Sequence, residues 1–142
     1  MLLPTFLRTV FVCVFVSAGS AKVHAESFSF KTPSGNIFCG YDDFDGTPQL
    51  RCDIRNYTPT AEPRPADCEL DWGGAFGIAA DGTSGIMICH GDTVATPDAK
   101  TLPYDTTWER GGIRCSSMQT GMTCRNAAGH GFFLSRAKQD VF

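Results

Sequence analysis

Residues 36–54 read NIFCGYDDFDGTPQLRCDI, with one cysteine on each side of a turn. Asp, Gly and Pro at positions 45–48 are typical turn residues because they tolerate or preset the backbone angles of a tight reversal. After the turn, residues 50–54 alternate so that Leu, Cys and Ile share one face, as in a strand with one buried side. The stretch therefore predicts a β-hairpin cross-linked between Cys39 and Cys52.

Strand-like segments continue outward from this hairpin in both directions. Residues 27–30 alternate polar and apolar, and residues 58–67 hold three prolines, which excludes a central strand or a helix interior there. Further strands, separated by turn residues, are expected at 75–80, 85–90, 112–115, 122–125 and 131–135, the last of the chain. Short strands at such spacing predict an all-β fold, a small antiparallel sandwich or barrel.

The cysteines indicate a disulfide framework. The chain contains 7 cysteines, of which Cys13 lies in the first 25 residues and the other six follow. Two pairs are local because each flanks a turn-rich stretch, and elimination leaves the third. The expected pairs are Cys39 with Cys52, Cys115 with Cys124 and Cys68 with Cys89. Each should contribute about 3 kcal/mol to stability, and the absence of C-x-x-C spacing argues against a structural zinc site.

The first 25 residues differ in composition from the rest of the chain. Arg8 is followed by an apolar run over residues 10–16 and then by small residues that end in Ala25. This pattern is typical of a secretory signal peptide, with cleavage after Ala25. The apolar run is too short to span a membrane. We therefore expect a secreted or periplasmic protein with a single domain over residues 26–142 and no membrane span.

Charge and motifs argue against several functions. The chain has 15 acidic and 12 basic residues, a net charge of −3, and its basic residues are scattered singly among acids. Nucleic-acid binding needs clustered Lys and Arg, so we do not expect it. A calcium loop with Gly46 in its sixth position fails because Tyr41 and Cys52 would occupy ligand positions. Phosphate-binding, dinucleotide-binding and His-based zinc motifs are absent, so neither cofactor nor metal is expected.

Five short motifs together resemble a family of small exported cysteine-rich bacterial domains of unknown function. They are TPSGNIxC at 32–39, RCD at 51–53, CxGDT at 89–93, GIRC at 112–115 and GHGFFxSR at 129–136. The resemblance covers nearly all of the chain after residue 25. It implies export and disulfide bonds, and it brings no activity with it.

Two histidines follow residue 25, His90 and His130, and each lies beside glycine. If residues 89–93 are extended, His90 and Asp92 point to the same face, where the carboxylate would orient the imidazole as a general base. His130 would then supply an acid, and Arg136 would bind an anion. The favoured alternative is that both histidines fix turns at strand ends, with Asp92 bonding the backbone of residues 93–94.

Aromatic residues are the candidates for ligand binding. Trp108 and Tyr104 are the main ones, because flat rings stack on glycans and peptides, whereas we expect Trp72 in the core. The first hypothesis is a monomeric binding or interaction module whose partner is an extracytoplasmic protein or a glycan. The alternatives are a small extracellular hydrolase built on the two histidines and a purely structural envelope protein. Binding is favoured over catalysis.

Overall fold

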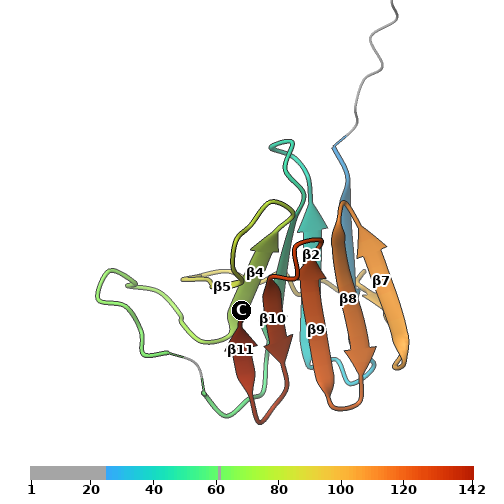
Figure 1. Cartoon of the computed structure of the whole chain (residues 1–142). Helices are drawn as coiled ribbons and strands as arrows, with labels where there is room; N and C mark the ends of the chain where they lie inside the picture. Colours follow the sequence, from blue (N-terminus) through green and yellow to red (C-terminus); the bar gives the residue numbers. More distant parts are fainter. Residues whose placement is uncertain (1–24, 61) are drawn as a thin grey trace, which may run out of the picture.

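Polar and apolar residues alternate along most of the strands, and this pattern builds sheets with one buried face. The computed structural model describes residues 25–60 and 62–142, in which eleven strands form two sheets packed face to face (Figure 1). The expected all-β sandwich with three disulfides is confirmed. The predicted signal peptide, residues 1–25, lies outside the described residues except for Ala25. Within the described ranges, no helix is long and apolar enough to cross a membrane.

The first sheet has the strand order β5-β4-β3-β2-β1-β6. Its strands are β1 (Ser27–Lys31), β2 (Ile37–Asp42), β3 (Gln49–Ile54), β4 (Ala75–Ala79), β5 (Ile86–Met87) and β6 (Lys100–Thr101). Neighbouring strands are antiparallel except β6, which pairs in parallel with β1. Chain segments far apart in sequence therefore meet at this edge.

The second sheet is a meander in which each strand pairs with the next along the chain. The order is β11-β10-β9-β8-β7. The strands are β7 (Thr106–Arg110), β8 (Ile113–Met118), β9 (Gly121–Asn126), β10 (Gly131–Leu134) and β11 (Gln139–Val141). All pairs in this sheet are antiparallel.

The core lies between the sheets and contains two of the disulfides. Cys39 and Cys52 are directly paired across β2 and β3, and Cys115 and Cys124 across β8 and β9. All four are fully buried, among the side chains of Phe30, Leu50, Phe76, Ile113, Met122, Phe132 and Leu134. The third disulfide joins Cys68, near the end of the proline-rich connection, to Cys89. The expected pairing is confirmed throughout.

Four strands differ from the sequence-based expectation. The segment expected at 85–90 forms a strand only over Ile86–Met87, and β6, β7 and β11 were not predicted. β11 follows the strand expected to be last. These strands are short or lie at a sheet edge, where polar residues alternate with partly buried ones and no continuous apolar run marks the strand. Whether these segments form strands depends on pairing with a neighbouring strand, which is a tertiary contact.

Candidate functional site

The carboxylate of Asp92 pairs with Arg51 and not with His90. Arg51 Nη1 donates to Asp92 Oδ1 at 2.7 Å, and this hydrogen bond and charge hold the pKa of the Asp92 carboxyl below its usual value. The same guanidinium binds the buried Asp53, with Nε 2.8 Å from Oδ1, and Asp53 Oδ2 accepts the Val94 N–H at 2.9 Å. Arg51 and Asp53 of β3 therefore hold residues 92–94 against the outer face of the first sheet.

His90 does not adopt the arrangement that the alternative, catalytic hypothesis requires. Its Nδ1 lies 2.9 Å from the carbonyl oxygen of Asp92, and its backbone N–H and C=O bond the backbone of Asp71. Residues 91–92 form a bend instead of continuing an extended strand. The imidazole therefore meets a backbone oxygen, and the carboxylate that would orient a general base is occupied by Arg51.

His130 lies in the turn between β9 and β10. Its backbone N–H donates to Asn126 Oδ1 at 3.0 Å, and its carbonyl accepts the Asn126 N–H at 2.9 Å. In the described part of the chain, no hydrogen bond or ion pair joins His130 to His90, Asp92 or Arg136. The four candidate catalytic residues are thus not linked as a hydrolase would require.

The two tryptophans differ from each other in their packing. The Trp108 ring stacks on Phe28 and lies 4.9 Å from Phe30 and 5.5 Å from Tyr41, measured between ring centroids. It therefore covers one side of the core. Trp72, expected in the core, is only partly buried, and its indole N–H donates to the Glu62 carbonyl oxygen at 2.8 Å in the proline-rich connection.

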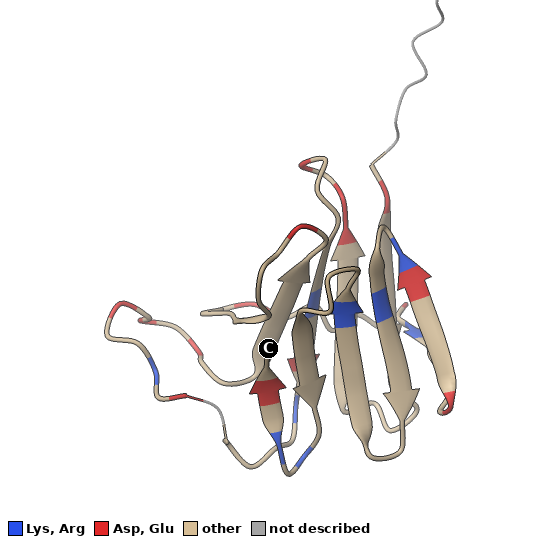
Figure 2. Ribbon diagram, in the orientation of Figure 1, with Lys and Arg blue, Asp and Glu red and all other residues tan. Residues whose placement is uncertain are grey.

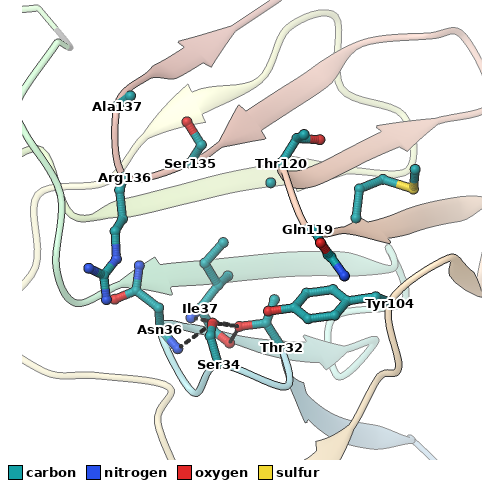
Figure 3. Close-up of a pocket in the computed structure, with 12 residues that line it drawn as sticks. Thr32, Ser34, Asn36, Ile37, Tyr104, Gln119, Thr120, Ser135, Arg136 and Ala137 are labelled. Atoms are coloured by element: carbon teal, nitrogen blue, oxygen red, sulfur yellow. Dashed lines mark hydrogen bonds between the residues drawn. The ribbon is translucent and has the colours of Figure 1, made fainter.

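Two of the sequence-predicted candidates, Tyr104 and Arg136, meet at one end of the sandwich. They line a pocket of about 320 Å³ between the β1–β2 turn, the loop before β7, the β8–β9 turn and the β10–β11 turn (Figure 3). The lining residues are Thr32, Ser34, Asn36, Ile37, Tyr104, Met118, Gln119, Thr120, Gly121, Ser135, Arg136 and Ala137. This volume is at the lower end of the range for ligand pockets, about 300–1,000 Å³.

The floor of the pocket is a fixed polar network. Thr32 Oγ1 and Ser34 Oγ lie 3.1 Å apart, and the Asn36 N–H donates to Ser34 Oγ at 3.3 Å. Asn36 Nδ2 donates to the Asn56 carbonyl oxygen at 3.0 Å, and its Oδ1 accepts the Asn56 N–H at 2.9 Å. Asn36 and Thr32 are buried. The floor is therefore held in place before any ligand arrives.

The rim carries polar side chains that are free to bind. Figure 3 shows Arg136 on one side of the pocket, facing Tyr104 and Gln119 on the other. Among the described residues, the side chains of Tyr104, Gln119, Thr120 and Arg136 make no hydrogen bond with the other lining residues and no ion pair. Tyr104 is partly buried and the other three are exposed. Together they offer amide, hydroxyl and guanidinium groups beside an aromatic ring.

A second, smaller pocket shares Arg136 with the first. It has a volume of about 210 Å³ and is lined by Asn56, Tyr57, Thr58 and Arg136. The Thr58 N–H donates to the Arg136 carbonyl oxygen at 2.7 Å, which fixes this segment beside the β10–β11 turn. Arg136 thus stands between two adjacent hollows.

Arg136 is the one charged side chain among the described residues that line either pocket. Acidic side chains gather elsewhere, notably around the β2–β3 loop at Asp42, Asp43 and Asp45 (Figure 2). β2 begins beside the pocket and ends at this loop, so the acids lie at the opposite end of the strand. Asp105 directly follows Tyr104 at this end of the sandwich, so the positive charge of the pocket wall is confined to Arg136, and it is there that the pocket favours an anion.

Sequence reasoning found two residues of this site and missed the others. Asn36 and Ser135 lie within the motifs of the family resemblance, but neither was predicted to bind a ligand. Gln119 and Thr120 form a two-residue turn, which was interpreted only as a hairpin connection. Their one available signal was the polar composition of a turn next to an exposed methionine, Met118.

The core sulfurs do not form a metal site in this structure. The Sγ atoms of Cys39, Cys52 and Cys124 lie within 4.8 Å of one another. Each belongs to a disulfide, and metal ligation by cysteine needs the thiolate. Their proximity instead reflects two disulfides packed against each other across the sandwich.

Comparison with known proteins adds a family and no activity. No curated protein and no solved structure matches the chain. Residues 10–142 match the sequence model of one family, described as a family of unknown function (DUF6636). Because this match covers nearly the whole chain, including every residue of the pocket described above, the chain belongs to the DUF6636 family.

Proposed function

We propose that the chain is an exported binding module whose ligand site is the pocket between Tyr104 and Arg136, and that its ligand is a glycan. The single observation that carries the proposal is the convergence of unpaired polar side chains from several turns around a fixed polar floor. Sites built on loops of a rigid scaffold are a common design for recognition. The buried disulfides of both sheets supply the rigidity here.

The chemistry of the lining favours a glycan over a peptide. Peptides often bind by adding a strand, which requires unpaired backbone groups at a sheet edge. At this site the turn backbone is engaged internally: Thr32 N–H donates to the Ile37 carbonyl and Ser135 N–H to the Lys138 carbonyl. A ligand therefore meets mainly side-chain hydroxyl, amide and aromatic groups. Sugar hydroxyls match the polar groups, and the face of a sugar ring matches Tyr104.

Export is part of the proposal. Disulfides persist in oxidising compartments, and this chain has three of them, two in its core. Together with the predicted signal peptide, they support a protein that acts in the periplasm or outside the cell as one domain over residues 26–142. Glycans of the cell envelope or its surroundings would then be within reach.

The test is an NMR titration of the oxidised, isotopically labelled protein with a panel of neutral and acidic trisaccharides. We expect chemical-shift changes around Tyr104 and Gln119 for one part of the panel. The Tyr104→Ala variant should lose about five-fold in affinity, because a stacked ring contributes on the order of 1 kcal/mol. Phe44→Ala is the matched control, since Phe44 is exposed in the β2–β3 loop away from the pocket.

Two results would contradict the proposal. One is the absence of any shift change with the whole panel, which would favour a purely structural protein. The other is a set of changes centred on His90 and His130, which would return the hydrolase hypothesis to consideration.

A further inference from the structure

Arg136 is placed to select ligands by charge. It lies on the wall shared by the two pockets, and the other described residues that line them are neutral. A guanidinium binds a carboxylate through two parallel hydrogen bonds, which is a stronger and more directional contact than a neutral one. A ligand that presents only hydroxyl groups would offer the Arg136 guanidinium no carboxylate to accept these two parallel hydrogen bonds.

We infer that the site takes an acidic oligosaccharide whose carboxylate binds Arg136 while its sugar rings occupy the two pockets. This inference rests on the proposed function and adds the class of glycan. One ring lies against Tyr104, with Gln119 and Thr120 donating to or accepting from its hydroxyls. The next ring lies beside Tyr57 and Thr58. The carboxylate sits between them.

The guanidinium is available for this contact. Arg51, Arg110 and Arg114 each pair with a carboxylate of the chain, and Arg136 makes no such pair within the described residues. Its carbonyl oxygen is held by the Thr58 N–H, so the backbone below the side chain is fixed. The side chain itself remains exposed and points toward the floor residue Asn36 (Figure 3).

The two-pocket arrangement also predicts a dependence on chain length. The first pocket, about 320 Å³, accommodates a ring-sized group, and the second, about 210 Å³, lies across Arg136 from it. A monosaccharide would fill only one of them. An oligosaccharide of two or three units would contact both and should bind more tightly than its monomer.

The experiment is calorimetric titration of the oxidised protein with a linear trimer of galacturonic acid and with the corresponding neutral galactose trimer. We expect the acidic trimer to bind more tightly than both the neutral trimer and monomeric galacturonic acid. Arg136→Gln should weaken binding of the acidic trimer by about ten-fold and binding of the neutral trimer by clearly less, since only the carboxylate makes the charged contact. For the unmodified protein, binding of the acidic trimer should also weaken as the sodium chloride concentration is raised, because added salt screens the exposed charge of Arg136.

Arg114→Gln is the matched control. It removes the same charge from an exposed position on β8, where Arg114 pairs with Glu109. We expect this variant to bind the acidic trimer as the unmodified protein does. If Arg114→Gln weakens binding as much as Arg136→Gln, the effect is one of net charge and the assignment to Arg136 is wrong.

The outcomes separate this inference from the proposed function. Equal binding of the acidic and neutral trimers, lost in Tyr104→Ala and unchanged in Arg136→Gln, would overturn the acidic class and retain a glycan site. Binding of a tripeptide through its free carboxylate, with neither trimer bound, would show a peptide site and overturn both. Absence of binding by the two trimers, the galacturonic acid monomer and the tripeptide would also overturn both.

Discussion

At the scale of single residues, the carboxylate of Asp92 takes part in an ion pair that holds a loop in place. Its carboxylate is held by Arg51, which also binds the buried Asp53. Through Val94, Asp53 then ties residues 92–94 to the outer face of the first sheet. The CxGDT and RCD motifs thus meet in space, and their charged residues hold a loop over a strand.

The Arg51–Asp92 pair predicts a stability that depends on pH. The pKa of Asp92 is lowered in the folded protein by its hydrogen bond with Arg51, relative to an ordinary value of 3.8. A carboxyl whose pKa is lowered by folding stabilises the fold at pH values above its pKa in the unfolded chain. This stabilisation is lost as the pH falls from about 4 towards the pKa of Asp92 in the folded protein. Asp92→Asn should therefore be slightly less stable than the unmodified protein at pH 7, and the difference should shrink below pH 4.

Urea unfolding of both proteins at pH 7, 5, 4 and 3 measures this difference. Asp98→Asn serves as the control, because Asp98 is exposed and its side chain makes no ion pair among the described residues. If the difference in the free energy of unfolding between Asp92→Asn and the unmodified protein stays constant down to pH 3, the Arg51–Asp92 pair is not its origin.

At the scale of elements, the start of β10 leaves no space for a side chain at Gly131. A Cβ on Gly131 would collide with the carbonyl oxygen of Cys124 on the paired strand, and a Cβ on Gly85 would collide with the Gly131 carbonyl. The C-terminal Phe142 carbonyl accepts the N–H groups of both glycines, at 2.8 and 2.9 Å. These contacts draw the β4–β5 loop, β10 and the chain end together.

Gly131→Ala should therefore destabilise the protein. Forcing an extra methyl into a packed contact costs about 1–3 kcal/mol, and backbone atoms on the partner strand cannot rotate away. Gly40→Ala is the matched control, since a Cβ there would meet Val94 at 3.4 Å, and we expect a change of less than about 0.5 kcal/mol. Urea unfolding of the two variants gives both values, and equal losses would rule out the steric explanation.

At the scale of the whole molecule, the three disulfides stabilise the fold in two different ways. Cys68–Cys89 closes a separation of 21 residues and is partly exposed, whereas Cys39–Cys52 closes 13 residues inside the core. A disulfide restricts the unfolded chain more when it closes a longer loop, so by this effect alone Cys68–Cys89 stabilises the fold more than Cys39–Cys52. Burial predicts the opposite order of stabilisation, because removing the core sulfurs of Cys39–Cys52 leaves a cavity.

We expect burial to dominate. Replacing Cys68 and Cys89 by alanine should lower the free energy of unfolding by about 3 kcal/mol. Replacing Cys39 and Cys52 by alanine should lower the free energy of unfolding by more. The loop-closure contributions of the two disulfides differ by only about 0.4 kcal/mol, and the cavity left in the core adds a larger cost. Urea unfolding of the two double variants compares them. The reverse order would mean that loop closure outweighs core packing in this sandwich.

Most strands of this protein could be predicted from local sequence, and the site could not. The cross-linked hairpins at 37–54 and 113–126 are marked by turn residues between segments that each carry a cysteine. β7 has polar side chains on its exposed face and β6 has only two residues, so their pairing partners, and not their own composition, determine them. The alternative catalytic hypothesis placed Asp92 and His90 on one face of an extended segment, and the chain instead bends at residues 91–92.

The fold class and the two hairpin disulfides could be predicted from local sequence, because alternation of apolar residues and the position of turns are local properties. The third disulfide followed only by elimination. The binding site, in contrast, depends on tertiary packing. Four strands lie between Tyr104 and Arg136 along the chain. The two residues line one pocket because antiparallel strands of both sheets end at the same end of the sandwich. Which turns face one another there depends on how the two sheets pack, and no short stretch of sequence encodes that packing.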